Sequence, residues 1–355
     1  MGSSTAFGGS ASVLDELDVA ALIGHRATAI DLELAADFLR DRSVLVTGAG
    51  GSIGSELCRQ IVQLGPSEVI MLDRDETALQ QVQVSVAGHG LLDTRDVVLA
   101  DIRDPGAITD VMLDRRPQVV FHAAALKHLP MLEQYPTEGW KTNVLGTANV
   151  IDAAVAAGVT TFVNVSTDKA ANPTSVLGTT KRIAERLTAD AAATTGHRYV
   201  SVRFGNVLGS RGSMLPLFID LIQTGHPLTV THPDATRFFM SVQEACHLVI
   251  QAGAVAEPGE VLVLDMGEPV RILDVAERLI ATLGIDTDIV FSGLRTGEKL
   301  HEELIGAGEA ETRPGHPKIT HATVPPLAPT DLPECIAQTG KRGSTAARML
   351  RLAAA

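Results

Sequence analysis

The chain is short of aromatic residues and of cysteine. Phe, Trp and Tyr make up 3% of its 355 residues, so the core must be built from smaller aliphatic side chains. Such a composition suits helices packed on a parallel sheet. The three cysteines, Cys58, Cys246 and Cys335, lie far apart and match no disulfide framework or zinc spacing. This pattern indicates a reducing compartment and predicts no metal centre.

The chain is also short of positive charge and of long apolar runs. Its formal net charge is -13, which argues against a nucleic-acid partner, because such proteins present a basic face. Neither a membrane-spanning run nor a signal peptide is evident, so we expect this chain to be soluble and cytoplasmic. The segment Met1–Ser10 is rich in glycine and serine and is left out of the fold prediction as a flexible leader.

A glycine turn gives the sharpest local signal. An apolar strand at 43–47 is followed by the spacing G-x-x-G-x-x-G and then by a helix. Glycines allow close backbone approach, and the unpaired N–H groups of a helix start attract a pyrophosphate. The residues expected to hold a dinucleotide here are Gly48, Gly51, Ser52, Ile53 and Gly54.

Asp73 ends the next predicted strand, where an acid can hydrogen-bond the adenosine ribose. A carboxylate repels a 2′-phosphate, so Asp73 favours NAD, while the adjacent Arg74 leaves NADP open. Asp101 and Ile102 follow a third strand and are expected to border the adenine, although Asp101 and Asp104 could instead only cap the next helix.

Strand and helix alternate from residue 43 to about 195. This alternation predicts an α/β fold with a doubly wound parallel sheet of Rossmann type, whose ligands bind at the carboxyl ends of the strands. Further residues expected beside the cofactor at that edge are Ala123, Ala124, Ala125, Asn143, Ser166 and Lys181.

The stretch from Ser166 to Lys181 concentrates chemical groups at one strand end. A hydroxyl, an acid and a base are adjacent at Thr167, Asp168 and Lys169. Leu177 and Lys181 lie four residues apart on the helix predicted to follow, and therefore share a face. The plainer interpretation is a polar loop in which Asp168 caps a helix and the lysines are solvated.

The second half supplies cations for a diphosphate. We interpret Arg203, Arg211, Arg237, Arg295 and Lys299 as a nucleotide-sugar site in a smaller α/β lobe. The predicted domains are a leader at 1–20, a helical lead-in at 21–42, a dinucleotide-binding domain at 43–203, a partly interleaved substrate lobe at 204–320 and a tail at 321–355.

On these residues the sequence resembles the extended short-chain dehydrogenases/reductases. More narrowly, it is similar to bacterial UDP-N-acetylglucosamine 4,6-dehydratases of polysaccharide biosynthesis. The resemblance spans about residues 21–315 and is most specific in Val46–Glu56, His122–His128, Ser166–Pro173, Arg203–Ser213 and Gly297–Glu302.

The resemblance implies an internal redox elimination with a tightly bound, recycled NAD. Hydride would leave sugar C4, Lys169 would remove the C5 proton, Asp168 would protonate the leaving C6 hydroxyl, and hydride would return to C6. Thr167 would assist, and Lys181 would bind the nicotinamide ribose. The residues implied to frame the UDP-sugar are Lys127, His128, Asn206, Arg211, Ser213, Arg237, Arg295 and Glu298.

Leu177 departs from the superfamily pattern, which places a tyrosine four residues before the lysine. An apolar residue there resembles the long membrane-anchored members, and residues 21–42 resemble their linker. The chain could therefore be a soluble part of a protein held at the inner face of the membrane. Two alternatives stay open, a UDP-hexose 4-epimerase and a non-catalytic sensor of dinucleotide or nucleotide sugar. By analogy with this fold we expect a homo-oligomer.

Overall fold

The computed structural model describes residue 17 and residues 22–23, 32–309, 311–312, 316–333 and 342–354. The expected leader, apart from residue 17, lies outside these residues, as does Cys335. None of the helices in the described part of the chain combines the length and the apolar character required to cross a membrane.

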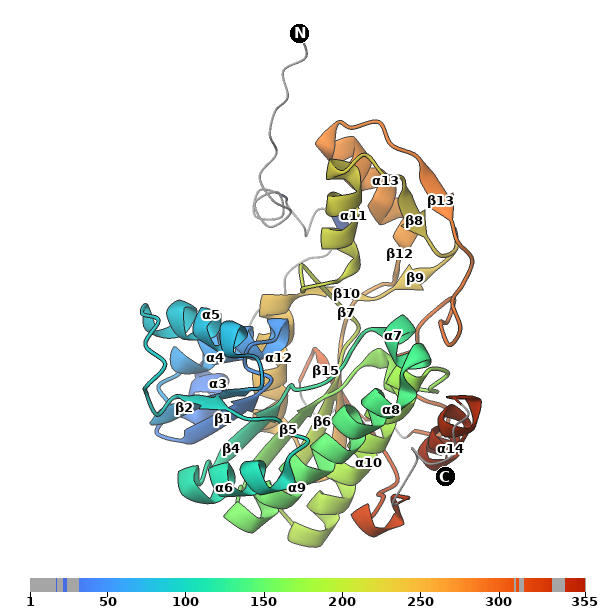
Figure 1. Cartoon of the computed structure of the whole chain (residues 1–355). Helices are drawn as coiled ribbons and strands as arrows, with labels where there is room; N and C mark the ends of the chain where they lie inside the picture. The colour runs from blue at the N-terminus through green and yellow to red at the C-terminus, as the bar shows by residue number, and fades with distance from the viewer. Residues whose placement is uncertain are drawn as a thin grey trace.

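A central sheet organises the larger lobe (Figure 1). Its strand order is β14-β15-β11-β6-β5-β4-β1-β2-β3, which contains the 3-2-1-4-5-6 order of a doubly wound dinucleotide fold. All pairs from β3 to β11 are parallel, and β15 and β14 add an antiparallel edge. The strands are β1 (Ser43–Thr47), β2 (Glu68–Asp73), β3 (Val97–Leu99), β4 (Val119–His122), β5 (Thr161–Val165), β6 (Arg198–Arg203), β11 (Glu260–Leu264), β14 (Glu311–Thr312) and β15 (Ile319–Thr323).

Two helical layers cover this sheet because its strands are apolar on both faces. Val44 and Val46 of β1 belong to one buried cluster, whereas Leu45 between them belongs to the cluster on the opposite face. One layer holds α3 (Leu32–Leu39), α4 (Ser52–Val62), α5 (Glu76–Ala87) and α12 (Val242–Val255), and the other holds α6 (Pro105–Arg115), α9 (Gly146–Ala157) and α10 (Val176–Thr195). The predicted α/β class and doubly wound sheet are confirmed.

Helix starts are fixed by short polar side chains. The Asp104 carboxylate caps α6 by accepting from the Ala107 N–H at 3.1 Å, as the plainer interpretation of Asp104 expected. The Ser175 hydroxyl caps α10 by accepting from the Gly178 N–H at 3.1 Å. Three short helical segments, α7 (Leu129–Gln134), α8 (Pro136–Gly139) and the π-helix η1 (Trp140–Leu145), lead into α9.

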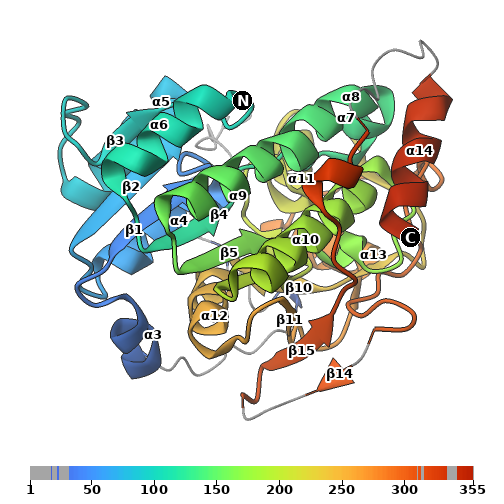
Figure 2. The ribbon, with the colours of Figure 1, turned by 90° about the horizontal axis from the view of Figure 1, so that it is seen from below.

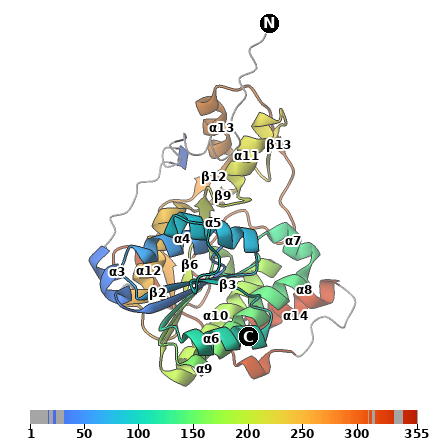
Figure 3. The ribbon, with the colours of Figure 1, turned by 60° about the vertical axis from the view of Figure 1, so that its left-hand side comes forward.

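A smaller lobe stands above the carboxyl edge of the sheet (Figures 1 and 3). Its own core includes Phe218, Ile219 and Leu279. Its helices are α11 (Met214–Gln223) and α13 (Ile272–Leu283). Its strands form the pairs β8 (Leu228–Val230) with β13 (Ile289–Phe291) and β9 (Thr236–Arg237) with β12 (Val270–Arg271), while β7 (Asn206–Leu208) pairs with β10 (Phe239–Ser241) near the junction of the lobes.

The interleaving expected after residue 203 arises because the chain returns to the large lobe more than once. Helix α12 and strand β11 lie within residues 204–320 and belong to the large lobe, as does β15, which crosses the expected boundary at residue 320. The expected tail is also built into the fold: α14 (Arg342–Ala354) packs on α10, and its Met349 joins a buried cluster (Figure 2). Apolar strands and helices late in the chain are stabilised by burial on the first sheet.

Candidate active site

The glycine turn joins β1 to α4 with very little space above its backbone. Gly48 has φ +67°, and a Cβ there would lie 2.7 Å from Ala124 Cα. A Cβ on Gly54 would lie 2.0 Å from the Gly48 oxygen. Helix α4 begins directly after Gly51. Bare backbone and free helical N–H groups therefore face the carboxyl edge of the sheet, which is the form of a pyrophosphate cradle.

Asp73 closes the turn from the end of β2. Its carboxylate accepts from the Gly50 N–H at 2.9 Å and from the Asp75 N–H at 3.0 Å. The sequence prediction overlooked Gly50, although a Cβ there would lie 2.4 Å from Ala78 Cβ. The position of Gly50 between Gly48 and Gly51 could have identified it from the sequence. Ser52 and Ile53 start α4, and the Ser52 hydroxyl accepts from the Arg211 N–H at 3.0 Å.

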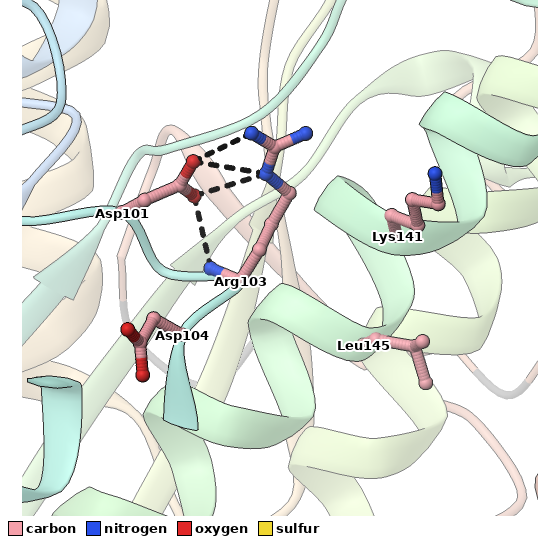
Figure 4. Close-up of a pocket in the computed structure, with 5 residues that line it drawn as sticks. All are labelled: Asp101, Arg103, Asp104, Lys141 and Leu145. Atoms are coloured by element: carbon pink, nitrogen blue, oxygen red, sulfur yellow. Dashed lines mark hydrogen bonds and ion pairs between the residues drawn. The ribbon is translucent and has the colours of Figure 1, made fainter. Parts of the chain in front are cut away.

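A cavity of about 370 Å³ opens beside the end of β3 (Figure 4). Asp101 and Arg103 turn towards each other there, and the Arg103 guanidinium donates to both Asp101 oxygens at 2.7–3.1 Å. Partial burial acts to raise the pKa of Asp101, but the bonds from Arg103 outweigh it and lower that pKa. Arg74 also approaches Asp101 at 3.6 Å. Asp101 therefore stays charged and does not cap α6, while Ile102 is buried.

Buried polar groups fix the carboxyl end of β4 and the loop that follows it. His122 lies between the Thr47 and Thr147 hydroxyls at 2.7 and 3.0 Å, and burial lowers its pKa to about 3, so this imidazole is neutral. The Asn143 amide accepts from the Leu126 N–H and donates to the Leu126 oxygen and to Thr180. Asn143 thereby fixes the loop that contains Ala123, Ala124 and Ala125.

The predicted chemical groups lie together at the end of β5. The Thr167 hydroxyl donates to Asp168 Oδ1 at 2.8 Å, and Lys169 Nζ donates to the same oxygen at 3.0 Å. Asn206 Oδ1 also accepts from Lys169 Nζ, at 3.2 Å. The Asp168 side chain is fully buried. Burial acts to lower the pKa of Lys169, but the Asp168 and Glu302 carboxylates outweigh it and raise that pKa. Lys169 is thus an ammonium in this arrangement.

Helix α10 places Lys181 and Leu177 beside this group. Burial lowers the pKa of Lys181 from 10.5 to about 8, and Glu185 acts in the opposite sense. Ser166 donates its hydroxyl to Glu185 at 2.6 Å, so this side chain is engaged within the protein. Leu177 is buried in an apolar cluster and contributes no ionisable group at the position of the superfamily tyrosine.

The residues expected around a sugar diphosphate form two groups. In the first, Lys127 Nζ donates to the Arg211 carbonyl at 2.7 Å, and the Arg211 guanidinium contacts the Gly50 carbonyl. Burial lowers the pKa of both Lys127 and His128. His128 packs beside Gly212, and the buried Ser213 hydroxyl finds no hydrogen-bond partner within the described part of the chain. Arg211 thus contacts the glycine turn.

The second group lies at the base of the smaller lobe. Arg237 Nη2 contacts Glu298 Oε1 at 2.7 Å, and Glu298 Oε2 accepts from the Arg295 N–H at 3.2 Å. Two cations interpreted as diphosphate ligands lie elsewhere. Arg203 is fully buried against Glu185 and Glu309, and Lys299 Nζ donates to the Ala171 oxygen at 2.9 Å. For Arg203 the interpretation was wrong, because carboxylates inside the protein satisfy its guanidinium. For Lys299 the interpretation stays a prediction.

Glu302 is the acidic residue that the sequence prediction left without a role. Its Oε1 lies 3.7 Å from Lys169 Nζ, and its side chain is 2% exposed. The motif Gly297–Glu302 is one of the most specific parts of the family resemblance. Nothing in the sequence, however, indicated that Glu302 reaches the end of β5.

Comparisons with known proteins agree with this architecture. The family model described as "Polysaccharide biosynthesis protein" matches residues 44–324. The capsular polysaccharide biosynthesis protein CapD of Staphylococcus aureus is 45% identical over 88% of this chain and 53% of its own length. The probable polysaccharide biosynthesis protein EpsC of Bacillus subtilis is 45% identical over 84% of this chain and 50% of its own. This chain thus spans about half the length of these curated relatives.

A solved structure gives the same match in three dimensions. The X-ray structure of Pen from Bacillus thuringiensis superposes with a TM-score of 0.74 and is 33% identical, covering 82% of this chain and 91% of that one.

Proposed function

This chain belongs to the polysaccharide biosynthesis protein family of extended short-chain dehydrogenases/reductases, and we propose that it catalyses the 4,6-dehydration of UDP-N-acetylglucosamine. The product is a UDP-2-acetamido-2,6-dideoxy-4-keto-hexose, a precursor for glycan assembly. The observation that carries the proposal is the contact of Thr167, Asp168 and Lys169 at the carboxyl end of β5.

The dinucleotide that this reaction requires fits the residues present. Added Cβ atoms at Gly48 and Gly54 would collide with backbone, so the turn stays open to a pyrophosphate. We assign Asp73 to the adenosine ribose, where a carboxylate would favour NAD over NADP. Bound there, NAD would accept a hydride from sugar C4 and return it to C6. Lys181, with its pKa near 8, is our candidate for the nicotinamide ribose.

Asp168 and Lys169 can supply both proton transfers with a single shared proton. Moving the proton from Lys169 Nζ to Asp168 Oδ1, across a 3.0 Å hydrogen bond, gives a neutral amine and a carboxylic acid together. The amine then takes the C5 proton, and the acid protonates the departing C6 hydroxyl to form water. Afterwards the lysine is an ammonium and the aspartate a carboxylate. When hydride returns to C6, the Lys169 ammonium protonates C5, and the lysine then regains a proton from water, which replaces the proton released from the C4 hydroxyl.

This proton chemistry separates dehydration from epimerisation. An epimerase removes and returns hydride at C4 and needs no acid and base for C5 and C6. Epimerisation also relies on a group that takes the C4 hydroxyl proton, and Leu177 provides none. In our proposal Thr167, hydrogen-bonded to Asp168 at 2.8 Å, relays the C4 hydroxyl proton to water before the Lys169 proton moves to Asp168.

The deciding experiment incubates the purified chain with UDP-N-acetylglucosamine in heavy water, without added cofactor, followed by mass spectrometry and NMR. We expect loss of one water and deuterium at C5. An epimer of unchanged carbon framework and hydroxyl count would indicate the epimerase, and unchanged sugar with NAD and UDP-sugar bound would indicate the sensor. Asp168→Asn and Lys169→Ala should each abolish dehydration and keep the same dinucleotide content as the parent.

A further inference from the structure

Lys169 has two acidic neighbours, and only Asp168 belongs to the expected catalytic motif. Glu302 Oε1 approaches Nζ at 3.7 Å. Two buried carboxylate oxygens beside the same ammonium, Asp168 Oδ2 and Glu302 Oε2, have no hydrogen-bond partner among the residues that the structure describes. A buried carboxylate without full hydrogen bonding is costly, so the arrangement depends on the positive charge between the two acids.

The loop that carries Glu302 is anchored on both sides of this residue. Before it, the Thr236 N–H donates to the Leu300 oxygen at 3.1 Å, and the Thr236 hydroxyl pairs with His301 Nδ1 at 2.9 Å. After it, Glu309 contacts Arg203 at 2.7 and 2.9 Å. Glu302 is therefore delivered to the end of β5 by fixed backbone rather than by a free surface loop.

We propose that Glu302 is a positioning residue that holds the Lys169 ammonium against Asp168 and sets the upper pH limit at which this pair keeps its shared proton. The inference rests on the proposed dehydration, because it assigns a purpose to the same proton. Without the second carboxylate, the lysine would lose its proton at lower pH, and the acid needed at C6 would be missing.

Four charged groups in the described part of the chain act on the Glu302 carboxylate. Lys169 and Lys299 act to stabilise its charged form, as does Arg237 from β9, whereas Asp168 opposes it. Burial is the largest influence and raises the pKa of Glu302, with the nearby Asp168 carboxylate adding to that effect. Burial acts to lower the pKa of Lys169, but the Asp168 and Glu302 carboxylates outweigh burial and raise that pKa.

The test follows the Lys169 ammonium directly by NMR of protein labelled with ¹³C at the lysine ε carbon. Lys169→Arg identifies the resonance, because that signal disappears. We expect Glu302→Gln to lower the Lys169 titration midpoint by about 1 pH unit or more, as removal of a charge within a few ångströms does. Glu302→Asp, which keeps the charge but shortens the side chain, should give a smaller decrease.

Glu303→Gln is the matched control. Glu303 is the next residue, but its side chain is 55% exposed and pairs with Asn172 and Lys299 instead. A Lys169 midpoint that is unchanged in Glu302→Gln, or lowered equally by Glu303→Gln, would overturn the inference. Thermal unfolding of each variant confirms that it is folded before its titration is compared.

Activity provides the second readout and separates this inference from the proposed function. Where the parent dehydrates UDP-N-acetylglucosamine, the high-pH limb of kcat should move to lower pH in Glu302→Gln, and a limb that stays in place would refute the positioning role. Where the parent does not dehydrate this sugar, the function fails, whereas a lowered Lys169 midpoint would still establish the contact with Glu302.

Discussion

Replacing Arg203 by methionine should destabilise the protein more than almost any other single change of similar size. Arg203 lies on β6 with its side chain fully buried, and it donates to Glu185 at 2.6 and 2.7 Å and to Glu309 at 2.7 and 2.9 Å. Methionine keeps much of the side-chain volume. The variant therefore isolates the loss of charge and hydrogen bonds.

The magnitude follows from what the substitution leaves behind. Glu185 and Glu309 are 0% and 3% exposed in their side chains, so two carboxylates would remain buried with only Arg182 close to both. Removing one partner of a buried ion pair typically costs about 3–5 kcal/mol. For a chain of 355 residues, with an unfolding entropy of about 2.1 cal/mol/K per residue, the melting temperature should fall by roughly 4–7 °C.

The difference in stability between the parent and Arg203→Met should also depend on pH. Burial acts to raise the pKa of Glu309, but its bonds to Arg203 prevail and lower that pKa from 4.5 to about 2. A depressed carboxyl pKa contributes stability above the unfolded value, and this contribution is lost as pH falls from 4.5 towards 2. In Arg203→Met the contribution is absent, and the buried carboxyls can instead be protonated. The difference in stability between parent and variant should therefore shrink on acidification.

The assay is thermal unfolding by circular dichroism at pH 7 and pH 3, with Arg198→Met as the control. Arg198 lies on the same strand but donates only to the carbonyls of Gly253 and Ala254, at 3.3 and 3.1 Å, so its replacement should cost about 1 kcal/mol or less at either pH. An Arg203→Met loss below about 1 kcal/mol, or a loss of the same size at both pH values, would refute the reasoning.

Three further predictions concern the cofactor edge. Gly54→Ala places a Cβ 2.0 Å from the Gly48 oxygen and should cost ~1–3 kcal/mol in urea unfolding and weaken NAD binding measured by calorimetry. Because the folded pKa of Lys181 is about 8 rather than 10.5, the parent should gain ~2 kcal/mol of stability between pH 8 and pH 10, and Lys181→Met should lose that gain in urea titrations. Leu177→Met should keep parental activity, whereas Leu177→Tyr overpacks its buried site by ~1–3 kcal/mol and lowers the melting temperature.

The sequence was sufficient for the parts of the fold that depend on local patterns. The turn at Gly48 and the acid at Asp73 follow strands in a spacing that only a few conformations satisfy. Apolar runs that alternate with helices predicted the doubly wound parallel sheet to which β1–β6 belong. The contact of Asp168 with Lys169 was also predictable, since the two residues are adjacent.

Local patterns could not predict which distant residues pair with each other. Arg203 and Arg237 look alike in the sequence, yet one is a core ion-pair residue and the other binds Glu298 at the base of the smaller lobe. Their difference depends on which carboxylates return from residues 298–309, about a hundred residues after Arg203. The later strands β11 and β15 were missed as parts of the first sheet for the same reason.

The segment 300–309 connects a stabilising ion pair with the proposed catalytic groups. The loop after Leu300 brings Glu302 to Lys169 and Glu309 to Arg203, while Glu185, the other partner of Arg203, accepts from Ser166 and lies one turn after Lys181 on α10. A rigid buried ion pair therefore stands behind a pair of groups that must exchange a proton. Because the position of Glu302 depends on the Glu309 anchor, weakening the Arg203 contacts should disturb the protonation of Lys169, although the carboxylates that Arg203 binds are Glu185 and Glu309.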